Sequence, residues 1–531
     1  MKLSAQTMPS QLRRGRLAAL LFVIFGAIAA YEAAQMIVVG KTIVIAIAVL
    51  ALLACAAVVV ILNSWQRGLF IFLGWLLFED FMRKYLGNNM AIYFAKDALV
   101  LVVYLSFFIA WRAKKVHTFR PPFLFALAIF FWFGVIQMFN PASTSIFYGV
   151  LGMKLYFLYV PLMLIGYALI NSEADLRRFF FFCSVLTIAI AGLGIAQAII
   201  GPSFLNPATL QDDIRELSMN YRVSPLSGEI AYRPTSVFVS NGRLQDFLIV
   251  SWLMSLGFGG YLILRSRKGR ILAFVTIAVV AAASFMSTSR GVLMWNLGSA
   301  LIVGAAFLWG APWKQREAIR AVKIIQRALL VVSLALFGLV IVFPNAFGAR
   351  LAVYSETLLP SSTASELTYR TQTYPLRNFL LAFEHPRWPY GYGIGTASLG
   401  MQYVTRIMHA EPMEIAVENG YGNLIVEMGI GGLILWIVLG TALCTAAWKI
   451  VKRLKGSPWL PLGFVIFWYA FLLMFPMGYS STGAYQDFVM NSFLWVLLGI
   501  LFRLPSIAMS AQFTVTAGAV TKPKPRGRWI T

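Results

Sequence analysis

Long apolar runs dominate the chain, and short polar connections separate them. The runs are continuous rather than alternating, and a membrane-crossing helix needs about 20 mostly apolar residues. The pattern therefore predicts an all-α, polytopic membrane protein with about fourteen transmembrane helices. The expected spans are 17–35, 42–62, 68–82, 95–111, 122–139, 149–170, 179–200, 244–264, 271–288, 292–309, 328–343, 420–448, 459–477 and 487–503. The third is the shortest and also fits a tilted or re-entrant segment.

Composition agrees with this pattern. Of the 531 residues, 60% are hydrophobic and only 12% are charged, whereas an average soluble domain carries about 25% charged residues. Cys55, Cys183 and Cys444 each lie inside an apolar run and form no ligand spacing. We expect buried thiols there, with no metal site and no cofactor.

Basic residues set the expected orientation. The formal net charge is +24, but Lys and Arg gather in alternate connections and form no face interleaved with aromatic residues, so membrane topology explains them better than nucleic-acid binding. Both termini should then be cytoplasmic. The expected organisation is a cytoplasmic N-terminus over 1–16, eleven spans within 17–343 with an outer loop over 201–243, a large outer loop with short helices over 344–419, three spans within 420–505, and a disordered cytoplasmic tail over 506–531.

The two long outer loops have a composition of their own. They contain ten of the twenty acidic residues and nine arginines, but no lysine. Arginine without lysine suits planar, bidentate recognition of phosphate or carboxylate groups. Salt bridges within the loops would explain part of the same pattern.

Two arginines stand out as candidate phosphate ligands. Arg290 follows three hydroxyl residues on a turn between two apolar runs, and a charge at the membrane boundary needs a partner; the alternative is an arginine that snorkels to the surface. Arg233 has no local acidic partner. Arg243, by contrast, stands three residues before Asp246, a spacing that allows a purely structural ion pair on a helix.

The segment that leads into the twelfth span carries further polar residues. Asn419, Asn423 and Glu427 are spaced four apart and share one helix face. Such a face either supplies polar contacts between helices or borders a wet cavity, with Glu418 at its outer rim. His409 lies upstream and is the histidine near this helix.

Taken together, these segments resemble the O-antigen ligase and O-antigen/exopolysaccharide polymerase superfamily of bacterial inner membranes. The matching pieces are Arg233–Asn241, Ser289–Gly291, Arg370 followed by Glu384–Pro386 and Gly391–Gly395, and Glu418–Gly429. They cover about 233–435 in the family's order. One departure is that the family's histidine aligns with Glu418.

The resemblance implies a GT-C-like, metal-independent glycosyltransferase whose active site faces the periplasm of the bacterial inner membrane. The donor would be an oligosaccharide on undecaprenyl pyrophosphate. Arg290 and Arg233, with Arg370 as a lesser candidate, would bind the pyrophosphate, and Glu418 or His409 would act on the acceptor hydroxyl. Asn419, Tyr421 and Arg243 would support the site.

Several functions remain open at this stage. We expect a polymerase of lipid-linked repeat units, with a ligase that transfers the glycan to lipid A core as the alternative. A transporter or flippase of lipid-linked sugars, or a scaffold of an envelope assembly complex, belongs to a different class. The expected partners are the lipid-linked oligosaccharide, the lipid bilayer, and a chain-length regulator or other polysaccharide-assembly proteins; nucleic acid is not expected.

Overall fold

The computed structural model describes residues 42–88, 90–116, 118–265, 268–310, 312, 338, 340–359, 363, 366–408, 417–480 and 483–520. They divide into two compact units. The smaller consists of Met1–Phe72 with Asp97–Ser106, and the larger of Leu73–Lys96 with Phe107–Thr531. His409 and the expected spans 17–35 and most of 328–343 lie outside the described residues.

Helices form most of the described chain. Their bounds are α2 Thr42–Asn63, α3 Trp65–Leu86, α4 Met90–Arg112, α5 Leu124–Met138, α6 Ile146–Phe157, α7 Leu162–Leu169, α8 Glu173–Ile200, α9 Asp212–Ser218, α10 Asn241–Arg265, α11 Arg270–Met286, α12 Arg290–Gly310, α14 Pro344–Leu358, η1 Tyr369–Thr373, α15 Tyr374–Leu381, α16 Met401–Met408, α17 Gly420–Arg453, α18 Leu460–Met474, α19 Pro476–Ser480 and α20 Phe488–Val520. A two-stranded antiparallel hairpin, β1 Tyr221–Val223 and β2 Ile230–Tyr232, is the sheet among them.

Eight of the described helical segments are long and apolar enough to cross a membrane. They are Ala91–Arg112, Ile146–Leu169, Glu173–Ile200, Asn241–Arg265, Arg290–Gly310, Gly420–Arg453, Leu460–Ser480 and Phe488–Met509. Three shorter apolar helices cover Leu52–Asn63, Leu124–Met138 and Arg270–Met286. The chain is therefore a polytopic helical membrane protein, and the larger number of fourteen spans stays a prediction. The expected span at 68–82 falls on α3, which carries buried charges (Glu79, Asp80, Arg83 and Lys84).

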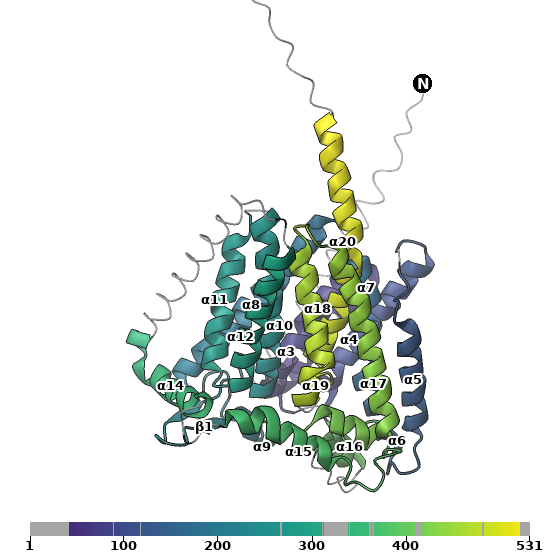
Figure 1. Cartoon of the computed structure of the whole chain (residues 1–531). Coiled ribbons are helices and arrows are strands. Elements are labelled where there is room, and N and C mark those ends of the chain that lie inside the picture. Colours follow the sequence, from purple (N-terminus) through teal and green to yellow (C-terminus); the bar gives the residue numbers. More distant parts are fainter. Residues whose placement is uncertain are drawn as a thin grey trace, which may run out of the picture. The chain divides into compact units, whose positions relative to one another are not determined.

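Within the larger unit, close helix packing depends on small residues. A Cβ on Gly166 would lie 2.2 Å from the Val496 carbonyl oxygen, and one on Gly499 would lie 2.1 Å from the Met163 carbonyl oxygen. Helices α7 and α20 therefore approach at backbone distance, as small residues permit in membrane proteins. Figure 1 shows α8, α10, α11, α12 and α18 standing beside one another in the same unit, and α10 packs against α11, α12 and α18.

The smaller unit contains part of α3 and α4 together with α2. Within it, the Ser106 hydroxyl donates to the Ile61 carbonyl oxygen at 2.7 Å. A Cβ on Gly68 would lie 2.8 Å from Cγ2 of Ile61. Cys55, which the sequence predicted to be buried, is exposed, whereas Cys183 and Cys444 are buried. The prediction for Cys55 was wrong because an apolar run says nothing about which helix face meets the rest of the protein.

The connections predicted to face outward hold the short elements of the larger unit. Helices α9, α14, α15 and α16 and the hairpin run across the lower ends of its long helices in Figure 1. Short helices in the 344–419 segment agree with the sequence prediction. The tail does not agree throughout, because α20 continues past Pro505 to Val520; residues 506–520 are thus helical rather than disordered, and 521–531 lie outside the described part.

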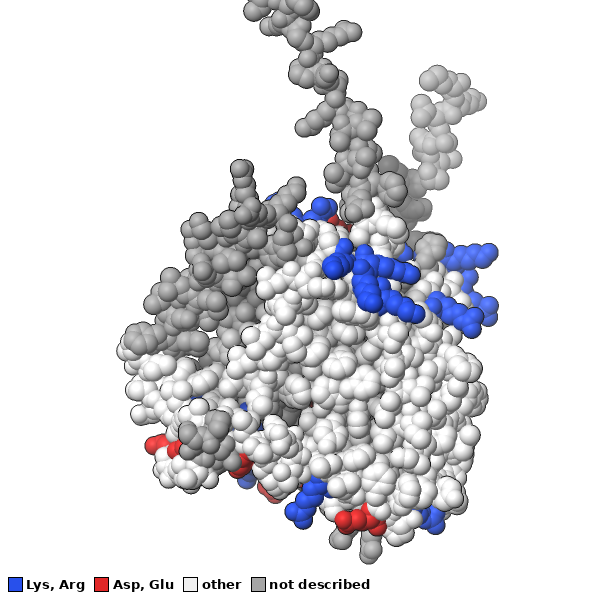
Figure 2. Space-filling model, in the orientation of Figure 1, with Lys and Arg blue, Asp and Glu red and all other residues white. Residues whose placement is uncertain are grey.

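Charge is unevenly distributed over the surface. On the face shown in Figure 2, the largest group of blue basic side chains lies toward the upper end, while the lower end carries most of the red acidic side chains together with a few blue ones. Lys452 and Arg453 occupy the last turn of α17, which is the end opposite Gly420. The elements of the connections 201–243 and 344–419 therefore lie at the less basic ends of the helices, and the side of the membrane that they face stays a prediction.

Candidate functional site

A cavity of about 970 Å³ lies among α10, α12, α18, α19, the hairpin, the end of α14 and residues 366–374. Its polar wall includes four arginines, Arg222, Arg233, Arg290 and Arg370, and two carboxylates, Asp246 and Glu366. Three of these arginines (Arg233, Arg290 and Arg370) were singled out from the sequence as phosphate ligands. The structure brings them together from segments separated by up to 137 positions, Arg233 to Arg370.

Much of the remaining lining of the cavity is apolar. Its lining includes Met294, Trp295, Ile302, Trp468, Phe471 and Leu472. These side chains come from α12 and α18, which are both candidate membrane spans. The cavity is thus lined by both cationic and apolar side chains, a combination that fits an amphiphile with an anionic head.

Local structure explains how Arg290 reaches the cavity. Thr288 adopts a left-handed conformation (φ 57°) in the turn before α12, and Arg290 is the first residue of that helix. The Ser289 hydroxyl donates to Oε1 of Gln245 at 2.7 Å, which ties the turn to α10. The hydroxyls beside Arg290 therefore position the turn.

Arg233 is held by the segment that follows it. The backbone N–H groups of Thr235 and Ser236 donate to Oε1 of Gln197 at 2.9 and 2.7 Å. Asn241 donates from Nδ2 to the Pro234 carbonyl oxygen at 2.9 Å. The motif between Arg233 and Asn241 therefore fixes the backbone between β2 and α10, while Arg233 itself lines the cavity.

The arginine wall carries unbalanced positive charge. Burial, reinforced by Arg290 and then Arg233, lowers the pKa of Arg222 to about 10. Burial also lowers the pKa of Arg233, whose buried Nε atom has no hydrogen-bond partner among the described residues. Since like charges close together in a partly buried site disfavour ionisation, a bound anion would relieve this repulsion.

One carboxylate already pairs with two of the arginines. Oε2 of Glu366 lies 2.8 Å from Nη1 of Arg290 and 3.5 Å from Nε of Arg370. Partial burial by itself raises the pKa of Glu366, but these two arginines lower it below its usual value. Glu366 was not singled out from the sequence, because Arg290 is distant in the chain and only Arg370, at i+4, is local.

Arg243 has a different role from the one its spacing suggested. Its guanidinium pairs with Asp80 on α3 at 2.5 Å rather than with Asp246, and it is not among the residues that line the cavity. The spacing allowed a local pair with Asp246, but Asp80 accepts from the guanidinium through both oxygens, at 2.5 and 2.6 Å. The supporting role of Arg243 in the site stays a prediction.

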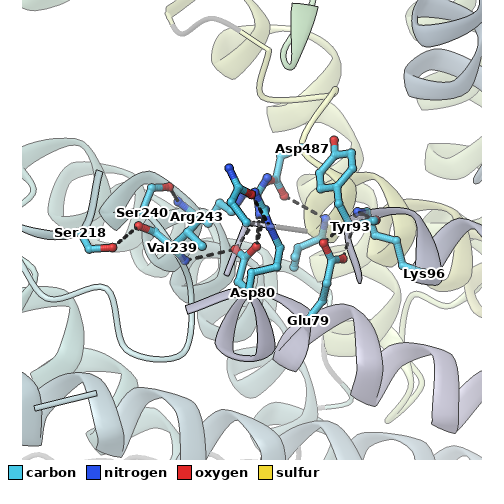
Figure 3. A network of polar contacts seen from close by, with 12 residues as sticks. Glu79, Asp80, Tyr93, Lys96, Ser218, Val239, Ser240, Arg243 and Asp487 are labelled. Carbon is cyan, nitrogen blue, oxygen red and sulfur yellow. Dashed lines mark hydrogen bonds and ion pairs between the residues drawn. The ribbon is translucent and has the colours of Figure 1, made fainter. Parts of the chain in front are cut away.

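Asp80 is the centre of a buried ionic network, shown in Figure 3. It also accepts from Nη1 of Arg83 at 3.0 Å and from the Val239 backbone N–H at 3.2 Å. Nearby, Lys96 pairs with Glu79 at 3.0 Å, and both side chains are fully buried. Such paired charges hold α3 and α4 against the start of α10, and sequence reasoning missed them.

The face of α17 that sequence analysis considered for a wet cavity is buried instead. Asn419 caps the helix by accepting from the Gly422 N–H at 3.0 Å and donates to the Pro375 carbonyl oxygen at 3.0 Å. Tyr421 donates to the Met474 carbonyl oxygen at 3.1 Å. Neither residue lines the cavity, so the alternative of polar contacts between helices is the one that the structure favours.

The contacts of Glu427 show which part the glycine-rich motif Gly391–Gly395 plays in the fold. Its buried carboxylate accepts from the Tyr156 hydroxyl at 3.0 Å, the Ser398 hydroxyl at 2.5 Å and the Ala397 N–H at 3.2 Å. A Cβ on Gly395, where φ is +91°, would lie 1.9 Å from the Tyr148 carbonyl oxygen. The motif therefore anchors a tight loop against α6 and α17, away from the arginine wall.

Glu418 lies beside the cavity rather than in its lining. Its carboxylate accepts a hydrogen bond from the hydroxyl of Tyr374, which does line the cavity. This bond raises the pKa of Tyr374. Glu418 is thus one side chain away from the arginine wall, while no placement is described for His409.

Comparison with known proteins adds no relative. No family model matches the chain, and no match was found among curated proteins. Within the described ranges, no group of three or more His, Cys, Asp or Glu side chains is arranged to hold a metal ion.

Proposed function

We propose that this protein is a membrane glycosyltransferase that polymerises undecaprenyl-pyrophosphate-linked glycan repeat units at the periplasmic face of the bacterial inner membrane. The observation that carries the proposal is the cavity that Arg222, Arg233, Arg290 and Arg370 line together with apolar side chains from two candidate spans. A diphosphate joined to a polyprenyl chain has the same division between charged and apolar parts. The motif resemblance named above supplies the reaction class.

In the proposed reaction, the arginines act on the charge that develops on the leaving group. The acceptor hydroxyl attacks the anomeric carbon of the donor sugar, the bond to the pyrophosphate oxygen breaks, and the lipid pyrophosphate leaves with the electron pair. Negative charge therefore grows on the leaving group, and preorganised arginines stabilise it without a metal ion. A ligase that uses another acceptor would perform the same step, and it remains the alternative.

Orientation is the first part of the proposal to test. Reporter fusions after Arg270 and after Lys455 should report a cytoplasmic location, because both residues belong to basic connections. A fusion after Ser362 should report the periplasm. Activity of a cytoplasmic reporter at Ser362 would contradict a periplasmic active site.

The group that takes the proton from the acceptor is the second part to test. Glu418→Gln and His409→Ala should differ in the amount of glycan that they form. Replacement of the residue that acts as the base lowers transfer by ~10²–10⁴ and leaves donor binding intact. The matched controls are Glu216→Gln, an exposed glutamate of α9, and His385→Ala, a histidine that packs on Tyr392. Normal transfer by both test variants would remove both residues from the mechanism.

A further inference from the structure

Glu366 occupies the place on the arginine wall where a phosphate group would bind. Its Oε2 atom contacts Arg290 at 2.8 Å and Arg370 at 3.5 Å, and all three residues line the same cavity. Carboxylate and phosphate oxygens bind guanidinium groups with the same geometry. A ligand that uses both arginines must therefore share them with Glu366 or replace it.

The burial of the three side chains indicates which of them can move. The Glu366 side chain is 41% exposed and that of Arg370 is 50% exposed, whereas Arg290 is only 12% exposed. A half-exposed carboxylate can exchange its arginine contacts for water at little cost, because exposed ion pairs contribute little net free energy. Arg290, which begins α12 on a fixed turn, stays in place.

The charges in the cavity indicate which of the two anions the arginines bind more strongly. The cavity wall holds four arginines against two carboxylates, Asp246 and Glu366. A diphosphate carries more charge and more acceptor oxygens than one carboxylate, so it satisfies the arginines better. The positive charges of Arg222 and Arg233 further favour binding of the diphosphate over binding of the Glu366 carboxylate.

We propose that Glu366 is an internal competing anion that lipid-linked diphosphate displaces from Arg290 and Arg370. This inference rests on the proposed function of the same arginines. When the diphosphate leaves, the carboxylate returns to the two guanidinium groups. Glu366 thereby limits how tightly the lipid pyrophosphate product is held, and it keeps the empty site from retaining other anions.

Calorimetric titration of the purified full-length protein with inorganic pyrophosphate tests this exchange directly. Glu366→Gln keeps the size of the side chain and removes its charge, so it should bind pyrophosphate up to about fivefold more tightly than wild type, because an exposed ion pair no longer has to be displaced. Glu366→Asp should give a smaller gain because its shorter side chain reaches the arginines less well. Glu216→Gln, which removes the same charge from an exposed site on α9, should match wild type.

The outcomes distinguish a Glu366 that competes with pyrophosphate for the arginines from a Glu366 that orients Arg290. Equal or weaker pyrophosphate binding by Glu366→Gln, with binding lost in Arg290→Ala, would overturn the inference and make Glu366 a residue that orients Arg290. Pyrophosphate binding that neither Glu366→Gln nor Arg290→Ala alters would overturn it as well. The proposed function fails on a different result, normal glycan formation by Arg290→Ala, so the two failures are distinguishable.

Discussion

Arg290→Ala should lower glycan transfer by roughly 10²–10³-fold, the usual loss when one preorganised stabiliser of a developing anion is removed. Arg290 begins α12 on a turn fixed by Ser289 and Gln245, and its side chain is 12% exposed. A charge contact in such a site is worth more than in bulk water. Arg290→Lys should also be impaired, since lysine keeps the charge but not the planar pair of donors.

The measurement is glycan chain formation in membranes, with protein amounts matched by immunoblot. Arg215→Ala is the matched control, because Arg215 is 49% exposed, lies on α9 and pairs only weakly with Asp212 at 3.7 Å. It should retain wild-type product. Normal product from Arg290→Ala at matched expression would remove the phosphate role of the arginine wall and, with it, most of the proposed mechanism.

The grouping of Arg233, Arg290 and Arg370 could be predicted from the sequence because membrane topology constrains it strongly, whereas Arg222 was not singled out. Once the basic connections fix which ends of the helices lie on the same side, Arg233, Arg290 and Arg370 must all lie at that side. Sequence spacing could not reveal Glu366 as the partner of Arg290, nor the apolar lining from α12 and α18. Those contacts depend on how helices pack, and a uniformly apolar helix carries little signal about which face is buried.

The ionic network around Asp80 shows the same limit. Arg243 has a local acidic neighbour at i+3, yet it pairs with a carboxylate 163 positions earlier in the chain. The charged residues in and next to the apolar run of α3 did carry a signal, because charges in a span are costly and face the protein interior. Their partners on other helices, however, could not be named without the fold.

Asp80→Asn should destabilise the protein by about 3–5 kcal/mol, the usual loss when one partner of a buried ion pair is removed. Asp80 is 2% exposed and pairs with both Arg83 and Arg243. Its replacement leaves two guanidinium groups short of their counter-ion in the protein interior. The fraction of protein that remains monodisperse in detergent after stepwise heating measures this loss.

Asp212→Asn removes the same charge from a side chain that is 97% exposed. The fraction of this variant that remains monodisperse after heating should therefore match that of wild type. The double variant Asp80→Asn with Arg243→Gln should recover part of the lost stability, because it removes the unpaired charge as well, while Arg83 keeps its hydrogen bond to Asn88 at 3.1 Å. A single variant as stable as wild type would show that Asp80 contributes no net stability. If the double variant is less stable than the single one, Arg243 contributes to stability through another contact, the one with the Phe488 ring at 4.3 Å.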